Sequence, residues 1–187
     1  MESPLKGKVL IASPKLLDPN FAKSVVLIVQ HDENGAMGLI INRATQTTVR
    51  DAWTQVSAVP YPNDDPLFQG GPCDGPLLVL HKEAIHGQME ILNGIWLSSD
   101  AGSVKALVSD ATEPIKFFVG YAGWSPQQLE AELSEGSWIV AEIDSSSILF
   151  TPGEFWEYLQ VQARQASHTS LRPAIDPRLI PPDPSVN

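Results

Sequence analysis

The segment that most constrains the fold runs from Ile115 to Val140 and reads IKFFVGYAGWSPQQLEAELSEGSWIV. Its first part, Ile115–Tyr121, is rich in β-branched and aromatic residues, which predicts a buried strand. Gly120 and Gly123 flank Tyr121 and Ala122 at the end of this strand, and glycine allows the backbone to turn sharply or to approach another chain segment. The segment therefore predicts a strand that ends in a tight glycine turn.

The second part of this segment predicts a short helix and a further strand. Ser125 is a candidate N-cap, Pro126 suits the first helical position, and Gln128 completes an S-x-x-Q capping box. Gly136 predicts a left-handed helix stop. We expect a strand to resume over Trp138–Ile143, so that a strand, a turn, a helix and a strand form one compact unit.

A β-hairpin is predicted near the N-terminus. The apolar runs Ser24–His31 and Met37–Asn42 are separated by a turn that contains Asn34 and Gly35, and Asn-Gly is the strongest short hairpin signal. Because a hairpin is antiparallel, a mixed and largely antiparallel sheet is favoured over a doubly wound parallel one. The fold class predicted is α+β.

Other elements follow from periodicity, capping residues and proline. Thr47 or Thr48 is expected to cap a short helix that ends near Val56, and Ser99 or Asp100 a helix that ends near Val108. The remaining strands are expected at Lys8–Ser13, Leu77–His81, Gly94–Leu97 and Ile148–Phe150, and a last helix at Pro152, with Phe155, Trp156, Leu159 and Ala163 on its apolar face.

The length of 187 residues fits one domain with an appendage. We expect a single α+β domain over residues 1–165 and a proline-rich C-terminal tail over residues 166–187. Five of the last fifteen residues are proline, which excludes helix there and predicts an extended segment.

The charge of the chain argues against direct DNA binding. The formal net charge is −10, and residues 51–187 hold six Lys or Arg against eighteen Asp or Glu. Duplex DNA binding needs a concentrated basic face, and the lysines and arginine that could form one are expected to be scattered and solvated. These residues are Lys6, Lys8, Lys15, Lys23 and Arg43.

We expect a cytoplasmic protein. The single cysteine, Cys73, fits a reducing compartment. The N-terminus has no long apolar stretch of the kind found in secretory signals, and the longest apolar run, Val25–Val29, is far too short to cross a bilayer. No membrane association is expected.

The sequence contains no G-x-G-x-x-G, G-x-x-x-x-G-K-S/T, G-x-S-x-G or H-E-x-x-H motif, and neither a catalytic residue, a metal nor a cofactor is predicted. An enzyme with another kind of site stays open, although a protein without catalysis is favoured. Cys73 and His81 could form a thiol–imidazole pair, but a lone cysteine is more often a small buried hydrophobic residue. His31, Asp32 and Glu33 could contribute to a metal site with His81 or His86. No spacing enforces that arrangement, and a polar turn is the simpler interpretation.

The best candidate ligand site combines strand ends with glycine turns. Asn42 and Arg43 end a hairpin strand, where they could grip a phosphate or carboxylate, or could equally pin the sheet. Tyr121 and Trp124 flank a glycine turn, where aromatic rings stack on ligands or plug a barrel end. The predicted ligand-binding residues are Asn42, Arg43, Gly70, Gly71, Tyr121 and Trp124.

Three blocks of this chain resemble the YqgE/AlgH family. They are DPNFAKSVVLIVQHDENGAMGLIINR over Asp18–Arg43, FQGGPCDGPLLVLH over Phe68–His81, and FFVGYAGWSPQQLEAEL over Phe117–Leu133. In this order they span most of residues 7–160. The combination of GYAGW and QLE is specific, so the chain is identified as a member of this bacterial family.

The resemblance implies a mixed, largely antiparallel sheet curled into a bifurcated pseudo-barrel with flanking helices. It also implies a transcriptional-regulator label with no catalytic mechanism attached. The chain departs from the family pattern at Ser125, Pro126 and Gln127, where further glycine is usual, and at Ala44, where proline is common. The proline-rich tail also differs from the family pattern.

Three function classes remain open from the sequence. The first is a regulatory or adaptor protein that acts through protein contacts with an unidentified partner. The second is a small-molecule or nucleotide-binding module at the glycine turns. The third is a hydrolase with an unrecognised site, for example at Cys73. The first is favoured because the chain is acidic and carries no catalytic signature.

Overall fold

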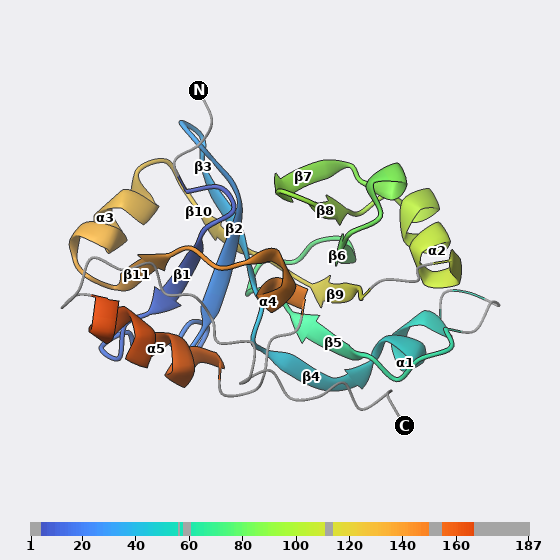
Figure 1. The fold of residues 1–187 in the computed structure, drawn as a ribbon, viewed down its shortest axis with the longest axis horizontal. Coiled ribbons are helices and arrows are strands. Elements are labelled where there is room, and N and C mark those ends of the chain that lie inside the picture. Colours follow the sequence, from blue (N-terminus) through green and yellow to red (C-terminus); the bar gives the residue numbers. More distant parts are fainter. Residues whose placement is uncertain (1–4, 56, 58–60, 111–113, 150–154, 167–187) are drawn as a thin grey trace.

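The computed structural model describes residues 5–55, 57, 61–110, 114–149 and 155–166. Within these residues the strands form two sheets, one of five and one of six strands. Figure 1 shows the sheets side by side, with the helices around them. The predicted tail beyond Ala166 and the predicted helix start at Pro152 lie outside the described residues, so both stay predictions.

The five-stranded sheet is antiparallel throughout and contains the predicted hairpin. In the pairing of β2 with β3, Asp32 lies opposite Gly35 across the Asn-Gly turn, which confirms the hairpin. The strands lie in the order β10 (Ala122–Trp124), β3 (Gly35–Ile40), β2 (Val25–Asp32), β1 (Val9–Ala12) and β11 (Trp138–Ala141).

The six-stranded sheet is mixed. Strand β5 runs parallel to β9, and the other neighbours are antiparallel. The order is β4 (Ala44–Thr48), β5 (Pro66–Gln69), β9 (Lys116–Val119), β6 (Leu78–His81), β8 (Ile95–Ser98) and β7 (Met89–Leu92).

The helices are short and lie at the periphery. Figure 1 shows α3 and α5 beside the five-stranded sheet, α1 and α2 beside the six-stranded sheet, and α4 between them. The helices are α1 (Val49–Trp53), the 3-10 helix η1 (Ala84–His86), α2 (Ala101–Asp110), α3 (Gln128–Ser134), α4 (Ser145–Leu149) and α5 (Phe155–Ala166).

Two segments carry the chain from one sheet to the other. The first leads from Ile40, the end of β3, into β4, and the second leads from Val119, the end of β9, through Gly120 into β10. Gly70 joins the two crossings: its N–H donates to Val119 O at 2.9 Å, and its carbonyl accepts from Ile40 N at 2.8 Å. The sheets therefore meet at a hydrogen-bonded junction.

One apolar core lies between the two sheets. It contains Val9, Leu27 and Leu39 from the five-stranded sheet and Leu80 and Phe118 from the six-stranded sheet, all fully buried. A second cluster fills the space between the five-stranded sheet and α3, and a third packs α1 and α2 against the six-stranded sheet. Both faces of each sheet are thus covered, which is why the central strands are almost continuously apolar.

The predicted fold class, α+β with a mixed and largely antiparallel arrangement of strands, is confirmed. Neither sheet closes on itself or curls strongly within the described residues, so the bifurcated pseudo-barrel is not confirmed. The predicted glycine-turn unit is divided between the sheets, which differs from the prediction of one compact unit. Its first strand, β9, belongs to the six-stranded sheet, whereas β10 and β11 join the hairpin in the five-stranded sheet, where Ala122 pairs with Gly38.

The predicted strand Ile148–Phe150 is wrong over the part that the structure describes. Ser145–Leu149 form helix α4, because the Asp144 carboxylate accepts hydrogen bonds from Ser146 N at 3.0 Å and Ser147 N at 3.1 Å and thereby caps a helix start. Phe150 lies outside the described residues.

The start of α3 also differs from the prediction. The helix begins at Gln128, and Gln127 before it is left-handed, with φ 64°. The Gln128 side chain accepts from Ser125 N at 3.0 Å, as a capping box requires, but the Ser125 hydroxyl donates to the same side chain instead of capping the helix.

Candidate functional site

Arg43, one of the predicted ligand residues, holds a loop of its own chain. Its guanidinium donates to the main-chain carbonyls of Asn20 at 2.6 Å and Ala22 at 3.3 Å. Burial lowers the pKa of Arg43, while the nearby charge of Asp18 opposes that shift. The cation that the sequence offers for phosphate or carboxylate binding thus secures the segment between β1 and β2.

Asn42 secures the other end of the same loop. Its side-chain carbonyl accepts from Val25 N at 2.8 Å, and its amide donates to Lys23 O at 2.9 Å. Lys23 has the left-handed φ of 57°, which non-glycine residues adopt infrequently. The Asn42 amide thus fixes a left-handed residue two positions before β2.

Gly70 and Gly71 pack directly against the crossing at Gly120 and Tyr121. A Cβ on Gly71 would stand 2.2 Å from the carbonyl carbon of Tyr121, and a Cβ on Gly70 would stand 2.4 Å from Gly120 O. Real Cβ atoms do not approach other atoms this closely, so these glycines let two backbones meet. Their role in the structure is main-chain packing at the junction.

Tyr121 and Cys73 form an adjacent pair beside this packing. They exchange two main-chain hydrogen bonds of 3.0 Å in an isolated antiparallel bridge, and both are half-buried. Gly75 and Gly123 lie close to the Tyr121 ring, since a Cβ on either would stand 3.2 Å or 3.4 Å from its ring atoms. A Cβ on Gly123 would also stand 3.6 Å from Cys73 Sγ.

Trp124 belongs to an aromatic cluster away from these glycines. Its ring stacks on Phe21 at a centroid distance of 6.0 Å and meets Trp138 edge-on at 6.0 Å. The indole N–H groups of Trp124 and Trp138 both donate to Glu132 Oε2, at 2.9 Å and 2.8 Å. Trp124 is 5% exposed, so its ring fills the core between β10 and α3.

The six predicted residues therefore fall into three groups. Asn42 and Arg43 bind the loop before β2, the glycines and Tyr121 pack at the junction, and Trp124 stacks on Phe21 of the loop that Arg43 holds. Trp124 lies opposite Ala36, beside the hairpin turn, whereas Asn42 and Arg43 follow Ile40 at the other end of β3. The polar groups of Asn42 and Arg43 are occupied by main-chain partners.

Lys116, which is not among the predicted site residues, is a buried cation in the core that the two sheets share. Its ammonium donates to Ile41 O at 2.6 Å and to Ile148 O at 3.4 Å, and it lies 4.1 Å from the centroid of the Phe68 ring. Burial lowers its pKa to about 7. One signal was available: a lysine stands within the otherwise apolar run IKFFV.

His81 is fully buried and bonds to Ser98. Its Nε2 lies 3.0 Å from Ser98 Oγ, which itself donates to His86 O at 2.6 Å. Because the hydroxyl proton is donated to a carbonyl, Nε2 is the donor in the bond between the imidazole and Ser98. Burial lowers the pKa of His81. The imidazole acts here as a core residue bound to a serine, and Cys73 pairs instead with Tyr121.

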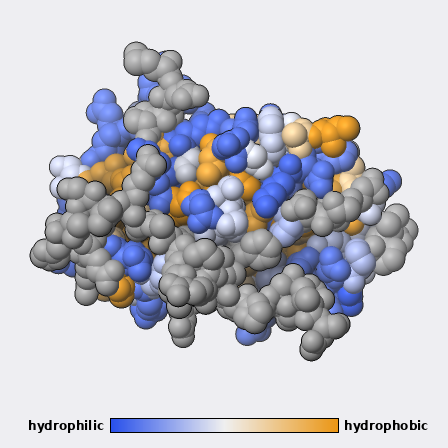
Figure 2. Space-filling model, viewed as in Figure 1, coloured by the Kyte–Doolittle hydropathy of each residue, from blue (hydrophilic) through white to orange (hydrophobic). Residues whose placement is uncertain are grey.

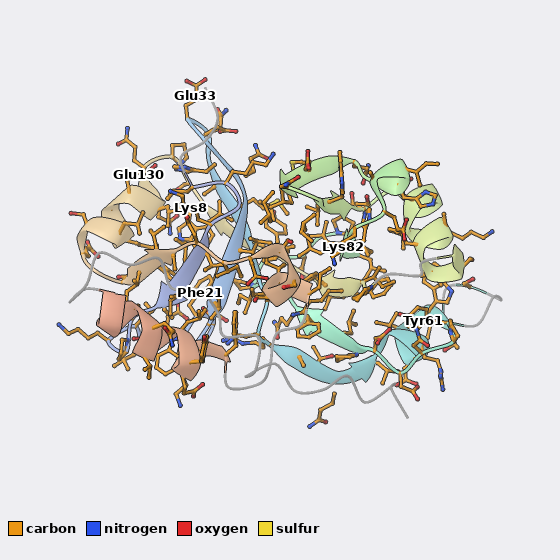
Figure 3. The ribbon with its side chains drawn as sticks, viewed as in Figure 1. Lys8, Phe21, Glu33, Tyr61, Lys82 and Glu130 are labelled. Atoms are coloured by element: carbon orange, nitrogen blue, oxygen red, sulfur yellow. The ribbon has the colours of Figure 1, made fainter. Side chains whose placement is uncertain are left out.

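His31 pairs with Glu130 of α3. Its Nε2 lies 2.7 Å from Glu130 Oε1, which links β2 to the helix. Main-chain and His31 hydrogen bonds lower the pKa of Glu130. Figure 3 shows Glu33 at the tip of the hairpin, directed away from the sheet. No group of three or more metal-ligating side chains is found within the described residues.

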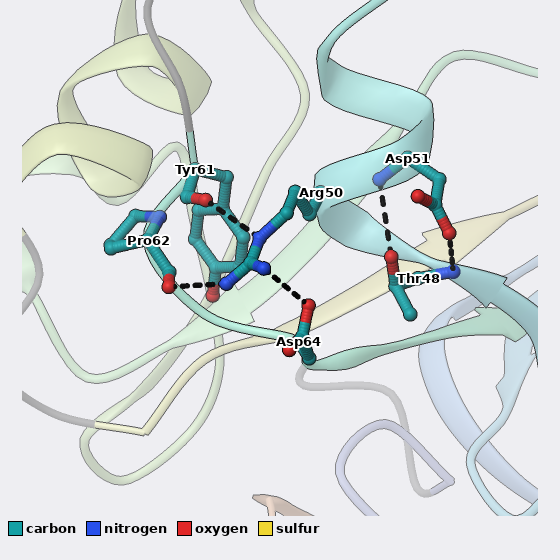
Figure 4. Close-up of polar contacts among 6 residues, drawn as sticks. All are labelled: Thr48, Arg50, Asp51, Tyr61, Pro62 and Asp64. Carbon is teal, nitrogen blue, oxygen red and sulfur yellow. Dashed lines mark hydrogen bonds and ion pairs between the residues drawn. The ribbon is translucent and has the colours of Figure 1, made fainter.

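The loop before β5 is clipped to α1, as Figure 4 shows. Arg50 donates to the carbonyls of Tyr61 at 3.3 Å and Pro62 at 2.6 Å and pairs with Asp64 at 2.9 Å. Burial and a hydrogen bond to Asp65 raise the pKa of the Tyr61 phenol. Thr48 caps α1 in a capping box with Asp51, which confirms the predicted cap (Figure 4).

The surface shows few apolar side chains. Figure 2 shows blue hydrophilic residues over much of the described part of this face, with hydrophobic residues in separate orange areas. The exposed large hydrophobic side chains among the described residues are Leu17, Ile85, Val119, Val140 and Val161. None of the described helices is long and apolar enough to cross a membrane.

A family model described as AlgH-like matches residues 9–166. A UPF0301 protein of Chlorobaculum tepidum is 37% identical over 148 residues, covering 76% of this chain and 77% of its own. A UPF0301 protein of Streptomyces coelicolor is 32% identical over 204 residues, covering 99% of this chain and 96% of its own.

Two solved structures share the fold. The solution structure of the AlgH protein from Pseudomonas aeruginosa has a TM-score of 0.73 and 31% identity, and the match covers 94% of this chain and 99% of that chain. The crystal structure of a protein from Corynebacterium diphtheriae has a TM-score of 0.67 and 23% identity, with 88% of each chain covered. The second likeness concerns the fold alone.

Proposed function

The chain belongs to the AlgH-like family, and from this premise we propose that it is a regulatory protein that acts indirectly, through contacts with other proteins. In this role it binds a protein partner and performs no chemistry of its own. A transcriptional effect then arises through the partner and without direct contact between this chain and DNA. The proposed place of action is the cytoplasm.

The observation that carries this proposal is the internal use of the best candidate ligand groups. The Arg43 guanidinium and the Asn42 amide bind main-chain atoms between Asn20 and Val25. A phosphate or carboxylate ligand would have to break these hydrogen bonds before it could use either side chain. This arrangement favours a rigid protein that binds partners through its surface. It argues against a polar pocket that binds an anion.

The charge of the chain supports the same proposal. With a net charge of −10, the chain repels the phosphates of duplex DNA at long range. Lys23, a member of the predicted basic set, contacts Glu157 at 3.9 Å and the Trp156 ring at 5.8 Å. A basic protein partner suits such a surface better than a nucleic acid does.

The test combines partner capture with a search for chemistry. The full chain is immobilised and exposed to lysate of its own organism with chemical cross-linking, and bound proteins are identified by mass spectrometry. We expect the same partner in repeated captures and its loss when free chain competes. Turnover of a metabolite by the purified chain, with no reproducible partner, would contradict the proposal. A gel shift on duplex DNA in moderate salt checks that direct binding is absent.

A small-molecule ligand is the second candidate function, and Tyr121 favours one place for it. The half-buried ring lies close to Gly75 and Gly123, beside Cys73, and neither glycine has a side chain to cover it. Of the six predicted residues, Gly70, Gly71 and Tyr121 would contribute there. A thermal-shift screen of metabolites tests this site, since a ligand stabilises the folded chain by mass action and Tyr121→Ala should abolish the shift.

We propose further that the two sheets together make the bifurcated pseudo-barrel of the family, within one domain over residues 1–165. The crossings near Asn42 and Gly120 join the sheets on one side. On the other side, Gly7 lies against β7, since a Cβ there would stand 3.0 Å from Ile91 O. These two contacts support a barrel-like closure. A chain shortened to residues 1–165 should unfold in one cooperative transition, as a single domain does.

A further inference from the structure

Strand β11 forms one edge of the five-stranded sheet, and its pairing with β1 is regular. Four consecutive residues pair in register, from Trp138 opposite Ala12 to Ala141 opposite Val9. The hydrogen bond from Ser13 N to Ser137 O, 2.9 Å long, shows which residue pairs of β1 and β11 are hydrogen-bonded to each other. In an antiparallel pair alternate residues bond to the neighbouring strand, so Ile139 and Ala141 bond to β1 while Trp138 and Val140 point their N–H and C=O groups outward.

At β4 and β10, hydrogen bonds are made on the strand or directly beside it. In β4 the Thr45 hydroxyl accepts from Thr47 N at 3.2 Å and donates to Thr47 O at 3.1 Å, so the main-chain groups of Thr47 are hydrogen-bonded within the strand itself. Next to β10, Tyr121 exchanges both its main-chain hydrogen bonds with Cys73. Devices of this kind prevent sheet edges from pairing with other chains.

The edge at β7 is also covered, and β11 differs from all three. Gly7 lies against the β7 main chain at Ile91. By contrast, none of the described residues outside β1 hydrogen-bonds to the main chain of Val140. Strand β11 contains no proline, lysine or bulge, and Val140 is 39% exposed. Such an edge is a template for a further strand.

Acidic residues surround this open edge. Glu135 comes just before the strand, Glu142 follows it directly, and Asp144 lies two residues further on, all of them exposed. The register of β1 and β11 continues toward Lys8 opposite Glu142, but no ion pair joins these two side chains. Because the Asp144 carboxylate caps α4, the negative charge available to an incoming segment is that of Glu135 and Glu142.

We propose that β11 is the docking site for an extended, basic segment of a partner protein, which adds to the five-stranded sheet as a sixth strand beside Val140. This inference deepens the proposed function and rests on it, because it names the surface and the chemistry of the partner. Main-chain hydrogen bonds to Val140 hold the segment, and its Lys or Arg side chains meet Glu135 and Glu142.

A second copy of the chain suits this edge less well. Pairing β11 with its own copy would bring two sets of the same carboxylates together, and each chain carries a net charge of −10. Like charges across an interface oppose association. A basic segment is instead attracted to these carboxylates. The charge of the edge therefore favours a basic segment over a second copy.

The probe is a displayed library of random peptides of about ten residues, roughly twice the length of a typical strand. The full chain is the bait. We expect enriched peptides to carry Lys or Arg among β-branched residues and to protect the amide of Val140 from hydrogen exchange. Val140→Pro removes the outward N–H without breaking a bond to β1, and should weaken binding by about tenfold or more, the effect of about one main-chain hydrogen bond.

Two matched variants make the result specific. Val140→Thr keeps the N–H and the β-branched shape, so it should bind the selected peptides as the parent does. Glu142→Lys reverses one charge at the edge and should weaken binding by about fivefold at low salt, with a smaller effect at high salt. An empty selection, acidic selected peptides, or equal binding to Val140→Pro and Val140→Thr would overturn the proposal.

The same variants separate this inference from the proposed function. A captured protein partner that binds Val140→Pro and the parent chain equally would leave the proposed function intact and overturn the docking site. Metabolite turnover without any partner would overturn the proposed function itself. A concentration-dependent dimer that Val140→Pro abolishes would show that a second copy occupies the edge, and would overturn the basic segment.

Discussion

The ammonium of Lys116 lies 2.6 Å from the carbonyl oxygen of Ile41, inside the core that the two sheets share. Ile41 belongs to the segment that crosses from one sheet to the other, and Lys116 lies in the six-stranded sheet. The contact therefore ties the six-stranded sheet to the crossing. The second acceptor, Ile148 O, lies in the last turn of α4, where helix carbonyls lack partners of their own.

The first prediction concerns the pH dependence of stability at Lys116. Burial lowers its pKa from 10.5 in the unfolded chain to about 7 in the folded one. Between these values the unfolded state binds more protons, so the free energy of unfolding rises with pH by roughly 1 kcal/mol per pH unit. Below the folded pKa both states hold the proton, and this contribution to the slope disappears.

Urea unfolding of the parent chain and of Lys116→Met between pH 6 and pH 10 measures this effect. The variant should lack the rise, because methionine has no proton to lose. Lys105→Met, at an exposed position of α2, serves as the control and should keep the rise. Equal slopes for the parent and Lys116→Met would show that folded Lys116 keeps its proton throughout.

The second prediction concerns Asn42. Asn42→Ala leaves the N–H of the fully buried Val25 without its acceptor, so we expect a loss of roughly 1–3 kcal/mol of unfolding free energy. Asn42→Asp keeps the acceptor and loses only the donor to Lys23 O, so its loss should be smaller. Chemical denaturation measures both. If the two variants match the parent, Asn42 has no structural role and becomes free to bind a ligand.

The third prediction separates backbone strain from close packing at the sheet junction. Gly94 and Gly120 have similar left-handed φ values, 77° and 70°. A Cβ on Gly94 meets nothing within 4 Å, whereas a Cβ on Gly120 stands 2.6 Å from Gly71 O. Gly94→Ala should therefore cost about 1–2 kcal/mol, the price of the left-handed conformation alone.

Gly120→Ala should cost clearly more than Gly94→Ala, because its methyl group must also push apart the two backbones that join the sheets. Thermal unfolding of the two variants gives the comparison directly. A similar loss for both would mean that the junction relaxes easily, and that the glycine contacts do not define how the sheets meet.

Local signals explain which elements the sequence predicted. The Asn34–Gly35 turn, the Thr48 cap and the left-handed Gly136 act within a few residues of the chain, and each is found where expected. Strand β10 was not predicted because it has three residues only and lies within the Gly120–Gly123 segment that predicts a turn. Strand β4 was missed because its residues, ATQTT, are mostly exposed and show no apolar alternation.

The candidate site was harder to predict because its contacts join distant parts of the chain. Arg43 bonds to carbonyls 23 and 21 residues away, and Lys116 to one 75 residues away. A sequence shows that a strand-end arginine needs acceptors, but not whether a ligand or the protein supplies them. For Arg43 the choice depends on the path of the loop before β2, which no local pattern specifies.

The last prediction concerns Glu132, whose Oε2 accepts from the indole N–H groups of both Trp124 and Trp138. The two indoles are almost fully buried, so replacing the carboxylate with an apolar side chain would leave two donors without a partner. We expect Glu132→Leu to lose roughly 2–6 kcal/mol of unfolding free energy, about 1–3 for each donor. Glu132→Gln keeps a carbonyl oxygen that can accept at this position, so it should lose less.

Urea unfolding followed by tryptophan fluorescence measures both variants, with Glu135→Leu, an exposed position one residue beyond α3, as the control. Should Glu132→Leu behave like Glu135→Leu, the aromatic cluster would be held by packing of Phe21 against the two rings and not by the carboxylate.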